Sequence, residues 1–409
     1  MPDGRPWPRV SIVTPSYNQG QFIEETIRSV LLQGYPDLEY IIIDGGSNDN
    51  SVEIIKKYES WLAYWVSEPD RGQSHAINKG LQKATGEILA WLNSDDVYHI
   101  DAVRVIVLFF LEHSNADMVY GDCYITNEHS QVIDKWKSPV FDLVQLVFKC
   151  FIPQQTAFFR KRAFQRVGPL NEDLNYVMDY DLWLKIAKSH SIRHISVFLA
   201  QHRKCSGTKT VDQPEAFWPE IIGILHQFFG DSALPSGIRA LEQDAYAIVY
   251  LHQAFQRFQL GQVDLGRKHL RQAFEIAPAV VSTQRERIIR MLMAYADASK
   301  PLEESRAYLR VVFDDLPETA LPLRDLEEVV FRRVCILHAC RFQRPEELAQ
   351  VRKLFLPMIL YDRAWLKDRA VLAELMGLAF GQQALTVAAA AKRFLKANSR
   401  KLLSMILMR

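Results

Sequence analysis

Short hydrophobic runs alternate with amphipathic segments along the first 90 residues of the chain. Runs rich in β-branched residues have the length and composition of buried strands, and they occupy residues 10–16, 39–47, 62–68 and 87–93. The segments between them repeat apolar side chains every three or four positions, as amphipathic helices do, at residues 21–33, 50–61 and 72–85. This alternation predicts an α/β fold, with a mixed, mostly parallel sheet that carries helices on both faces.

The pattern changes after about residue 210. Residues 211–235 read as a linker, and from residue 236 onward helical periodicity dominates while glycines and β-branched runs become rare. We therefore predict an α/β domain at 1–210, a linker at 211–235 and an all-α domain at 236–409. Residues 250–278 resemble one tetratricopeptide helix pair. Because one repeat does not define an array, the type of helical domain stays open.

Polar side chains gather where the predicted strands end. In a parallel sheet the carboxyl ends of the strands share one edge, and ligands bind there. This distribution predicts a ligand site. The residues that follow the four strands are Ser16, Tyr17 and Asn18, then Asp44, then Glu68 and Asp70, and then Asn93 to Asp96.

Two adjacent carboxylates, Asp95 and Asp96, end the fourth strand. Such a pair suits a hard divalent cation, which prefers oxygen ligands and is commonly completed by substrate phosphates. Taken alone, the pair is equally consistent with a solvated turn or the cap of a following helix. Asp44, at the same edge, is an acceptor suited to a base or a ribose hydroxyl, so the context favours a nucleotide site.

Composition narrows the function classes only slightly. The net charge of +1 gives no field for binding nucleic acid. Five cysteines (Cys123, Cys150, Cys205, Cys335 and Cys340) without paired spacing favour reduced thiols in a cytoplasm. The first residues, "MPDGRPWPRV", lack the charged-then-apolar pattern of a signal peptide, so we do not expect export, and the sequence has no run of about 20 apolar residues. Residues 370–391 predict a packed helix, and peripheral attachment to the inner face of the cell membrane stays open.

Several separated motifs resemble one known family. "VSIVTPSYNQGQFIEETIRSVLLQGYPDLEYIIIDGGSNDNS", "EPDRGQSHAINKGLQKATGEILAWLNSDD", "IPQQTAFFRKRAFQRVGPLNEDL" and "MDYDLWLKIA" occur in that order. They are similar to the bacterial glycosyltransferase family 2, whose catalytic domain has the GT-A fold. The resemblance covers about residues 9–210. It implies a metal-dependent, inverting transferase that uses a nucleotide-diphosphate sugar and Mn²⁺ or Mg²⁺.

The resemblance also implies a donor site. Asp96 and Asp95 would hold the metal, and Asn93 stands where the family usually has an acid. The residues implied to contact the donor are Thr14, Pro15, Ser16, Tyr17, Asn18, Asp44, Asp70, Arg71, Lys79, Asn93, Asp95 and Arg203. Two positions depart from the family pattern. Cys205 stands where the family has a histidine, and His202 is the candidate to take over the role of that histidine. His75 stands where relatives often have an acidic residue.

By the same resemblance, Asp179 would be the base that deprotonates the acceptor hydroxyl, with Met178 in place of the common glutamate. Asp181 is the alternative base. In a helix, residues two apart face different ways, so only one of these carboxylates should point into the cleft. Gln154, Gln155 and Asp181 would line the acceptor side, where amide groups suit sugar hydroxyls.

Three functions remain for comparison. The first is a glycosyltransferase acting on a glycan, lipid-linked or protein acceptor, in cell-surface polysaccharide or glycoconjugate synthesis. The second is an inactive nucleotide-sugar-binding scaffold whose helical domain recruits protein partners. The third is a nucleotidyltransferase, which the absence of a basic phosphate loop in "TPSYNQGQF" disfavours. The presence of both Asp96 and Asp179 favours the first.

Overall fold

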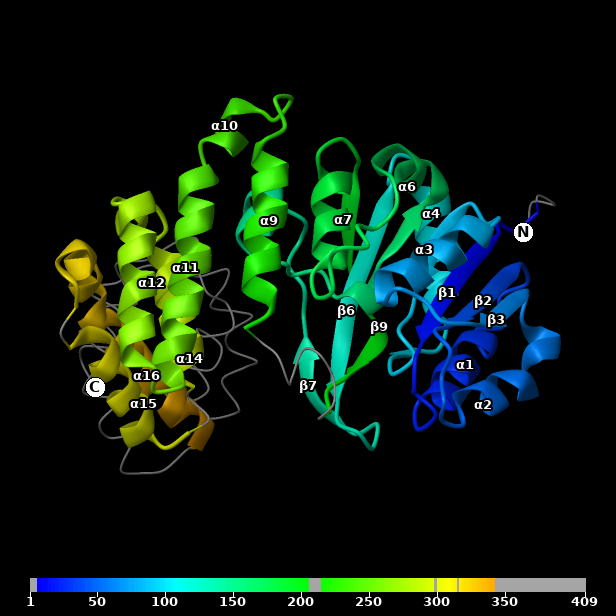
Figure 1. Ribbon diagram of the computed structural model, residues 1–409, viewed down its shortest axis with the longest axis horizontal. Helices are drawn as coiled ribbons and strands as arrows, with labels where there is room; N and C mark the ends of the chain where they lie inside the picture. The colour runs from blue at the N-terminus through cyan, green and yellow to red at the C-terminus, as the bar shows by residue number, and fades with distance from the viewer. Residues whose placement is uncertain (1–5, 206–214, 298–299, 315, 343–409) are drawn as a thin grey trace, which may run out of the picture. The chain divides into compact units, whose positions relative to one another are not determined.

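The chain folds into two compact units, Met1–Ala245 and Tyr246–Arg409 (Figure 1). Figure 1 shows the computed structural model, which describes residues 6–205, 215–297, 300–314 and 316–342. The first unit contains the sheet, and the described part of the second is helical. The predicted boundaries, 1–210, 211–235 and 236–409, stay a prediction.

A nine-stranded mixed sheet is the centre of the first unit. Its strand order is β3-β2-β1-β4-β8-β6-β9-β5, and β7 pairs with β6 outside that path. The strands are β1 (Val10–Ser16), β2 (Leu38–Asp44), β3 (Tyr64–Ser67), β4 (Ile88–Trp91), β5 (Val97–Tyr98), β6 (Met118–Thr126), β7 (Val132–Trp136), β8 (Phe158–Arg160) and β9 (Ile192–Arg203). The first four strands are mutually parallel, and they confirm the four runs expected from the sequence.

Helices cover both faces of this sheet, as the alternation of strands and helices predicted. Successive side chains of a strand point to opposite faces, so Val10 and Ile12 of β1 join a core with α1, α2 and α4. Val13 faces the other side and meets α3 at Gly80, where a Cβ would lie 2.3 Å from Val13 Cγ1. The helices of this part are α1 (Ile23–Leu31), α2 (Ser51–Lys57), α3 (Gln73–Lys83), α4 (Ala102–Glu112), α5 (Leu143–Phe148), α6 (Lys161–Val167) and α7 (Met178–Ala187), with short η1 (Glu59–Trp61) and η2 (Gln154–Thr156).

A helix occupies much of the segment that the sequence predicts as a linker. It is α9 (Phe217–Phe229), and it buries Ile224, Leu225, Phe228 and Phe229. These apolar positions repeat at helical spacing, so the segment packs as an amphipathic helix. The first unit extends beyond it through the short α10 (Ser236–Arg239) to Ala245.

The second unit is helical in every described segment, which agrees with the predicted all-α region. Gly261, at φ +73°, ends the turn after α11, and a Cβ on Gly266 of α12 would lie 2.7 Å from Phe258 Cε1. Glycine therefore permits the close approach of the two helices. A tetratricopeptide type stays a prediction. The elements are α11 (Glu242–Gln259), α12 (Val263–Ile276), α13 (Val280–Thr283), α14 (Arg285–Ala296), α15 (Leu302–Phe313), η3 (Glu318–Leu326) and α16 (Glu327–Phe342).

Two further expectations concern thiols and membranes. The four cysteines whose side chains are described, Cys123, Cys150, Cys205 and Cys335, form no disulfide. In the described part of the chain, no helix is long and apolar enough to cross a membrane. The helix predicted at residues 370–391 lies outside the described residues.

Candidate active site

The carboxyl ends of the parallel strands lie side by side at one edge of the sheet. Ser16 is in register with Asp44, and Asp44 with Ser67. The end of β4 joins them, because Leu92 N donates to Val13 O at 2.9 Å. The structure thus brings together the loops whose polar residues the sequence singled out.

Within residues 14–18, burial separates side chains that can meet a ligand from those that cannot. Thr14 is fully buried, and its Oγ1 lies 3.0 Å from Tyr40 Oη. Pro15 is buried. Ser16 Oγ is also buried, without a hydrogen-bond partner in the described part of the chain. Tyr17 is 60% exposed. Tyr17 is therefore the side chain of this segment that is most open to a ligand, and a donor contact by Thr14, Pro15, Ser16 or Asn18 stays a prediction.

Asp44 shapes the loop that follows β2. The carboxylate is fully buried; its Oδ2 accepts from Gly46 N (3.1 Å), Ser47 N (2.9 Å) and Ser67 Oγ (2.7 Å), and its Oδ1 from Ser47 Oγ (2.6 Å). Asn18 N donates to Ser47 Oγ at 2.8 Å. A nucleotide contact by Asp44 stays a prediction, and it would use the remaining acceptor capacity of Oδ1.

Asp70 brings the loop after β3 against the loop after β2. Asp70 Oδ1 accepts from Gly72 N at 2.8 Å, at the start of α3. Its Oδ2 lies so near Gly45 that a Cβ there would be 2.6 Å away. Only glycine fits that position without displacing the carboxylate. The predicted donor residues Asp44 and Asp70 are thus on touching loops.

The two predicted cations of this region both have carboxylate partners that the sequence did not identify. Arg71 forms an ion pair with Glu172, and its side chain is 69% exposed. Lys79 forms an ion pair with Glu68, the residue after β3. Each cation is held beside the sheet edge by its partner, and contact with a donor phosphate stays a prediction.

Asp96 is the buried member of the adjacent pair after β4. It is 1% exposed, and its Oδ1 accepts from Arg203 N at 3.0 Å and lies 3.2 Å from His202 Nδ1. Its Oδ2 is buried and has no hydrogen-bond partner within the described residues. A buried carboxylate oxygen without a donor is costly, so this atom is suited to a ligand, and a cation would fit best.

Asp95, Asp96 and His202 lie close enough for the charge of one to change the pKa of another. Burial, reinforced by the charge of Asp96, raises the pKa of Asp95 to about 7. Burial lowers the pKa of His202, but the charge and hydrogen bond of Asp96 outweigh it, and the net pKa is raised. Two carboxylates at one site cannot both ionise cheaply. A positive charge at this position would relieve that repulsion.

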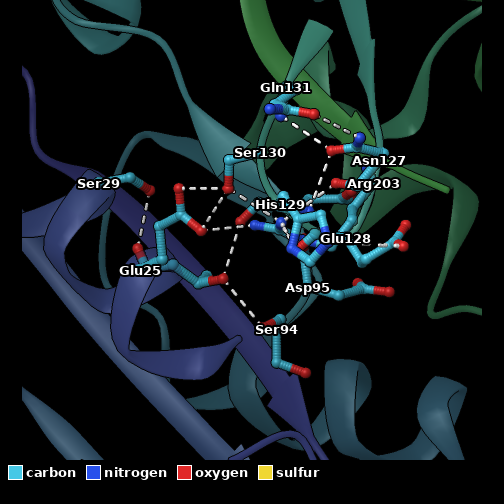
Figure 2. Close-up of polar contacts among 12 residues, drawn as sticks. Glu25, Ser29, Ser94, Asp95, Asn127, Glu128, His129, Ser130, Gln131 and Arg203 are labelled. Atoms are coloured by element: carbon cyan, nitrogen blue, oxygen red, sulfur yellow. Dashed lines mark hydrogen bonds and ion pairs between the residues drawn. The ribbon is translucent and has the colours of Figure 1, made fainter. Parts of the chain in front are cut away.

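Arg203 anchors the loop that contains Asp95 (Figure 2). It is 2% exposed; its Nε donates to Asp95 O at 2.9 Å, its Nη1 to Ser130 Oγ at 3.0 Å and its Nη2 to Glu25 Oε2 at 2.6 Å. Its guanidinium also lies 4.5 Å from the ring centre of Phe22. The resemblance implied that Arg203 contacts the donor, and that contact stays a prediction. In the structure its guanidinium bonds to protein acceptors, so Arg203 also positions the loop.

Asn93 completes the loop without adding charge. Its Oδ1 accepts from Gln73 Nε2 at 2.8 Å, which ties the loop to α3. Among the residues that the structure describes, no three His, Cys, Asp or Glu side chains are grouped as a metal site. Any cation would therefore depend on Asp95 and Asp96 together with atoms of the substrate.

Asp179 lies in the first turn of α7. Burial raises its pKa to about 6, while the hydrogen bond from Tyr180 N (2.8 Å) and the nearby His202 act in the opposite direction. Asp179 is therefore within electrostatic range of the residue that contacts Asp96. The ring of Trp183 stacks on Trp91 of β4 at 5.5 Å, which ties α7 to the strand that leads to Asp95 and Asp96.

The other residues predicted for the acceptor side have protein contacts of their own. Asp181 is 3% exposed, and its Oδ2 lies 2.6 Å from Lys185 Nζ. Gln154 Nε2 donates to Trp91 O at 2.8 Å, whereas its Oε1 is buried without a hydrogen-bond partner in the described part of the chain. Gln155 is buried. Gln154 Oε1 is thus the atom of this group best suited to bind an acceptor.

One further residue that supports the site has a detectable signal in the sequence. Thr26 is fully buried on α1, and its Oγ1 donates to Ser94 O (2.9 Å) and to Asp96 O (2.8 Å). It occupies the apolar face of its helix, three residues after Ile23 and four before Val30. A polar residue at such a position needs a buried partner, although the pattern does not say which.

The sheet and its helices have the GT-A fold. The crystal structure of S. aureus TarS, residues 1–349, in complex with UDP-GlcNAc is similar with a TM-score of 0.52 at 19% sequence identity, covering 78% of this chain and 90% of that chain. Residues 11–168 match the family described as glycosyl transferase family 2. The predicted fold is thereby confirmed, and the family match agrees with the predicted family.

Curated relatives agree with that assignment. A PGL/p-HBAD biosynthesis glycosyltransferase of Mycobacterium bovis (strain BCG / Pasteur 1173P2) is 29% identical over 206 residues, which cover 49% of this chain and 78% of the relative. An uncharacterised glycosyltransferase of Rickettsia typhi is 26% identical over 258 residues, covering 56% of this chain and 79% of the relative.

Proposed function

We propose that the chain transfers a sugar from a nucleotide-diphosphate sugar to a hydroxyl acceptor, with inversion at the anomeric carbon. The observation that carries the proposal is the combination of two buried carboxyl groups that both interact with His202. Asp96 contacts His202 and has an orphaned buried oxygen, and Asp179, on which His202 acts electrostatically, has a pKa raised to about 6 by burial. A carboxyl with a perturbed pKa beside a specific charge partner is characteristic of a catalytic site. The TarS structure, which contains UDP-GlcNAc, supports a nucleotide-sugar donor.

Asp95 and Asp96 are suited to hold Mn²⁺ or Mg²⁺. The partnerless Asp96 Oδ2 and the mutual repulsion of the two carboxylates both favour a bound cation. When bound, such an ion neutralises the charge that builds up on a leaving diphosphate. Arg203 and Thr26 hold the loop in place through its carbonyl oxygens, so the two carboxylates are pre-organised for this task.

Asp179 acts as the general base in this proposal. It takes the proton of the acceptor hydroxyl while that oxygen forms a bond to the anomeric carbon. The bond from the anomeric carbon to the diphosphate oxygen breaks on the opposite side, and the nucleoside diphosphate leaves with the bonding electron pair. A single displacement with one base inverts the configuration. A carboxyl with a pKa near 6 is mostly ionised at neutral pH and is still a useful proton acceptor.

The acceptor is proposed by class only. A glycan or lipid-linked oligosaccharide of cell-surface polysaccharide or glycoconjugate synthesis fits the family, and a protein acceptor or partner would use the helical unit. Cytoplasmic location, with attachment at the inner membrane face as an alternative, likewise stays a prediction. Fold likeness alone does not name a substrate.

A thermal-shift screen of nucleotide sugars with and without Mn²⁺ tests the donor site. A ligand at 100 times its Kd stabilises the folded state by about 3 kcal/mol, so the correct donor should raise the Tm by several degrees, and more so with Mn²⁺. Asp96→Asn should lose the Mn²⁺-dependent part of that shift, while the matched control Asp173→Asn, at an exposed position, should keep it. If no nucleotide diphosphate or nucleotide sugar stabilises the protein, the proposal fails. Donor binding without any sugar transfer would favour the scaffold.

A further inference from the structure

Helix α9, which follows the sheet of the first unit, lies beside α7 (Figure 1). The two helices are parallel, since contacts join their first ends and their last ends. At the beginning, the rings of Tyr176 and Phe217 are 5.0 Å apart. At the end, Lys188 Nζ forms an ion pair with Asp231 Oδ2 at 2.9 Å. The position of α7 is therefore tied to α9 along its length.

A carboxylate of α9 caps the start of α7. Glu220 Oε1 accepts from Asn175 N at 2.8 Å, and Glu220 Oε2 accepts from Tyr176 N at 2.9 Å and Val177 N at 3.2 Å. These three amides immediately precede Met178, the first residue of α7. One side chain thus fixes three consecutive peptide groups.

The sequence of α7 supplies no such cap itself. Its N-cap residue is Val177, which forms no side-chain hydrogen bond. The first amides of a helix lack partners within the helix, and a negative charge near them is favourable. Glu220 provides this charge from a different element, 43 residues along the chain from Val177. This contact decides where α7 begins.

Asp179 is the second residue of α7, so its position depends on that beginning. The hydrogen bond between Asp179 Oδ1 and Tyr180 N is a local contact that moves with the helix. The stacking of Trp183 on Trp91 anchors the helix one turn further on. Of these two anchors, Glu220 acts nearer to Asp179 in the sequence, because it binds the amide of Val177, two residues before Asp179.

We propose that Glu220 is a positioning residue for Asp179, so that α9 takes part in the transfer step although it lies beyond residues 11–168, the part that matches the family. The inference rests on the proposed function, in which Asp179 is the base. Displacing a catalytic group by about 1 Å can cost about a hundredfold in rate. Among the described residues, the hydrogen bonds of Glu220 join it to residues 175–177 and not to the loops after β1, β2 and β4. Substitution of Glu220 should therefore leave donor binding unchanged.

The test compares Glu220→Ala and Glu220→Gln with the wild-type chain in a sugar-transfer assay. Glu220→Ala should lower kcat ten- to a hundredfold while the donor KM stays within about twofold. Glu220→Gln keeps an acceptor oxygen and should recover part of the loss. Glu112→Gln, at an exposed position of α4, is the matched control and should behave as wild type. Thermal unfolding and the stoichiometry of nucleotide binding show what fraction of each variant is folded.

A double-mutant cycle separates positioning from simple stabilisation. If Glu220 acts through Asp179, then Glu220→Gln should slow the wild-type chain severalfold but should cause no further loss in the Asp179→Asn chain. Equal losses in both backgrounds, or a donor KM that rises as kcat falls, would overturn the proposal. Should Glu220→Ala not fold, the Glu220→Gln comparison decides alone. If Asp179→Asn by itself transfers sugar normally, the base assignment has failed, which is a separate result.

Discussion

Two pairs of carboxylates, Asp95 with Asp96 and Asp179 with Asp181, look alike in the sequence but are used differently. The first pair sits in a loop at a strand end, and both members belong to one coupled cluster with His202. The second pair is on a helix, where residues two apart point about 200° from each other. Asp179 is in electrostatic range of His202, whereas Asp181 pairs with Lys185.

The difference shows that backbone conformation decides whether neighbouring acids cooperate. A loop anchored by Arg203 and Thr26 can turn two adjacent carboxylates toward one ligand. A helix separates its acids, so that Asp179 interacts with His202 while Asp181 forms an ion pair with Lys185. Changing each member in turn tests this division, and the predictions below run from the largest effect to the smallest.

Asp179→Asn should lower the transfer rate by about 10²- to 10⁴-fold, because a general base contributes that much. The donor KM and the thermal shift caused by the nucleotide should stay close to wild type. Steady-state kinetics and donor titration check both. Transfer at the normal rate would show that Asp179 is not the base.

Asp96→Asn should lower transfer by about 10²- to 10³-fold, the range seen when one stabilising electrostatic group is lost. It should also abolish the response of the rate to added Mn²⁺, which Asp179→Asn should retain. A Mn²⁺ titration of both variants measures this contrast. If both variants respond to Mn²⁺ alike, the two pairs are not divided in the way described.

The pH profile should include an acidic limb from Asp179. Burial raises its pKa to about 6, and only the ionised form can accept a proton, so kcat/KM should fall as pH drops through about 6, by about tenfold per unit below it. The Asp179→Asn chain should lack this limb. The stability of the fold should change in the opposite direction. Because burial raises the folded-state pKa of Asp179, its ionisation destabilises the fold, and the free energy of unfolding should fall as pH rises toward about 6.

Asp181→Asn should change kcat by no more than about threefold. The free energy of unfolding should instead fall by about 1 to 3 kcal/mol, because removing the charge of the buried Asp181 carboxylate leaves Lys185 without its ion-pair partner. Denaturant unfolding measures the loss, with Asp173→Asn as the exposed control. A large loss of kcat at unchanged stability would instead place Asp181 in the catalytic step.

The sequence by itself determined the alternation of strands and helices and the edge at which polar residues gather. These features depend on local periodicity, which the chain encodes within a few turns or strands. The strand run before Asp95 and Asp96 predicted their place at that edge. The resemblance to glycosyltransferase family 2 added the expected roles, including Asp179, and the fold that it implied is the one observed.

Tertiary structure alone decided which polar atoms are free for a ligand. Arg203, expected at a diphosphate, is engaged by Glu25, which lies 178 residues away. Asp44 accepts four hydrogen bonds from Gly46, Ser47 and Ser67, and Glu220 reaches back to cap α7. Such contacts join distant segments and leave no periodic signal in the chain. The buried Asp96 Oδ2, which has no hydrogen-bond partner among the described residues, and the raised pKa of Asp179 likewise depend on burial, which only the folded arrangement decides.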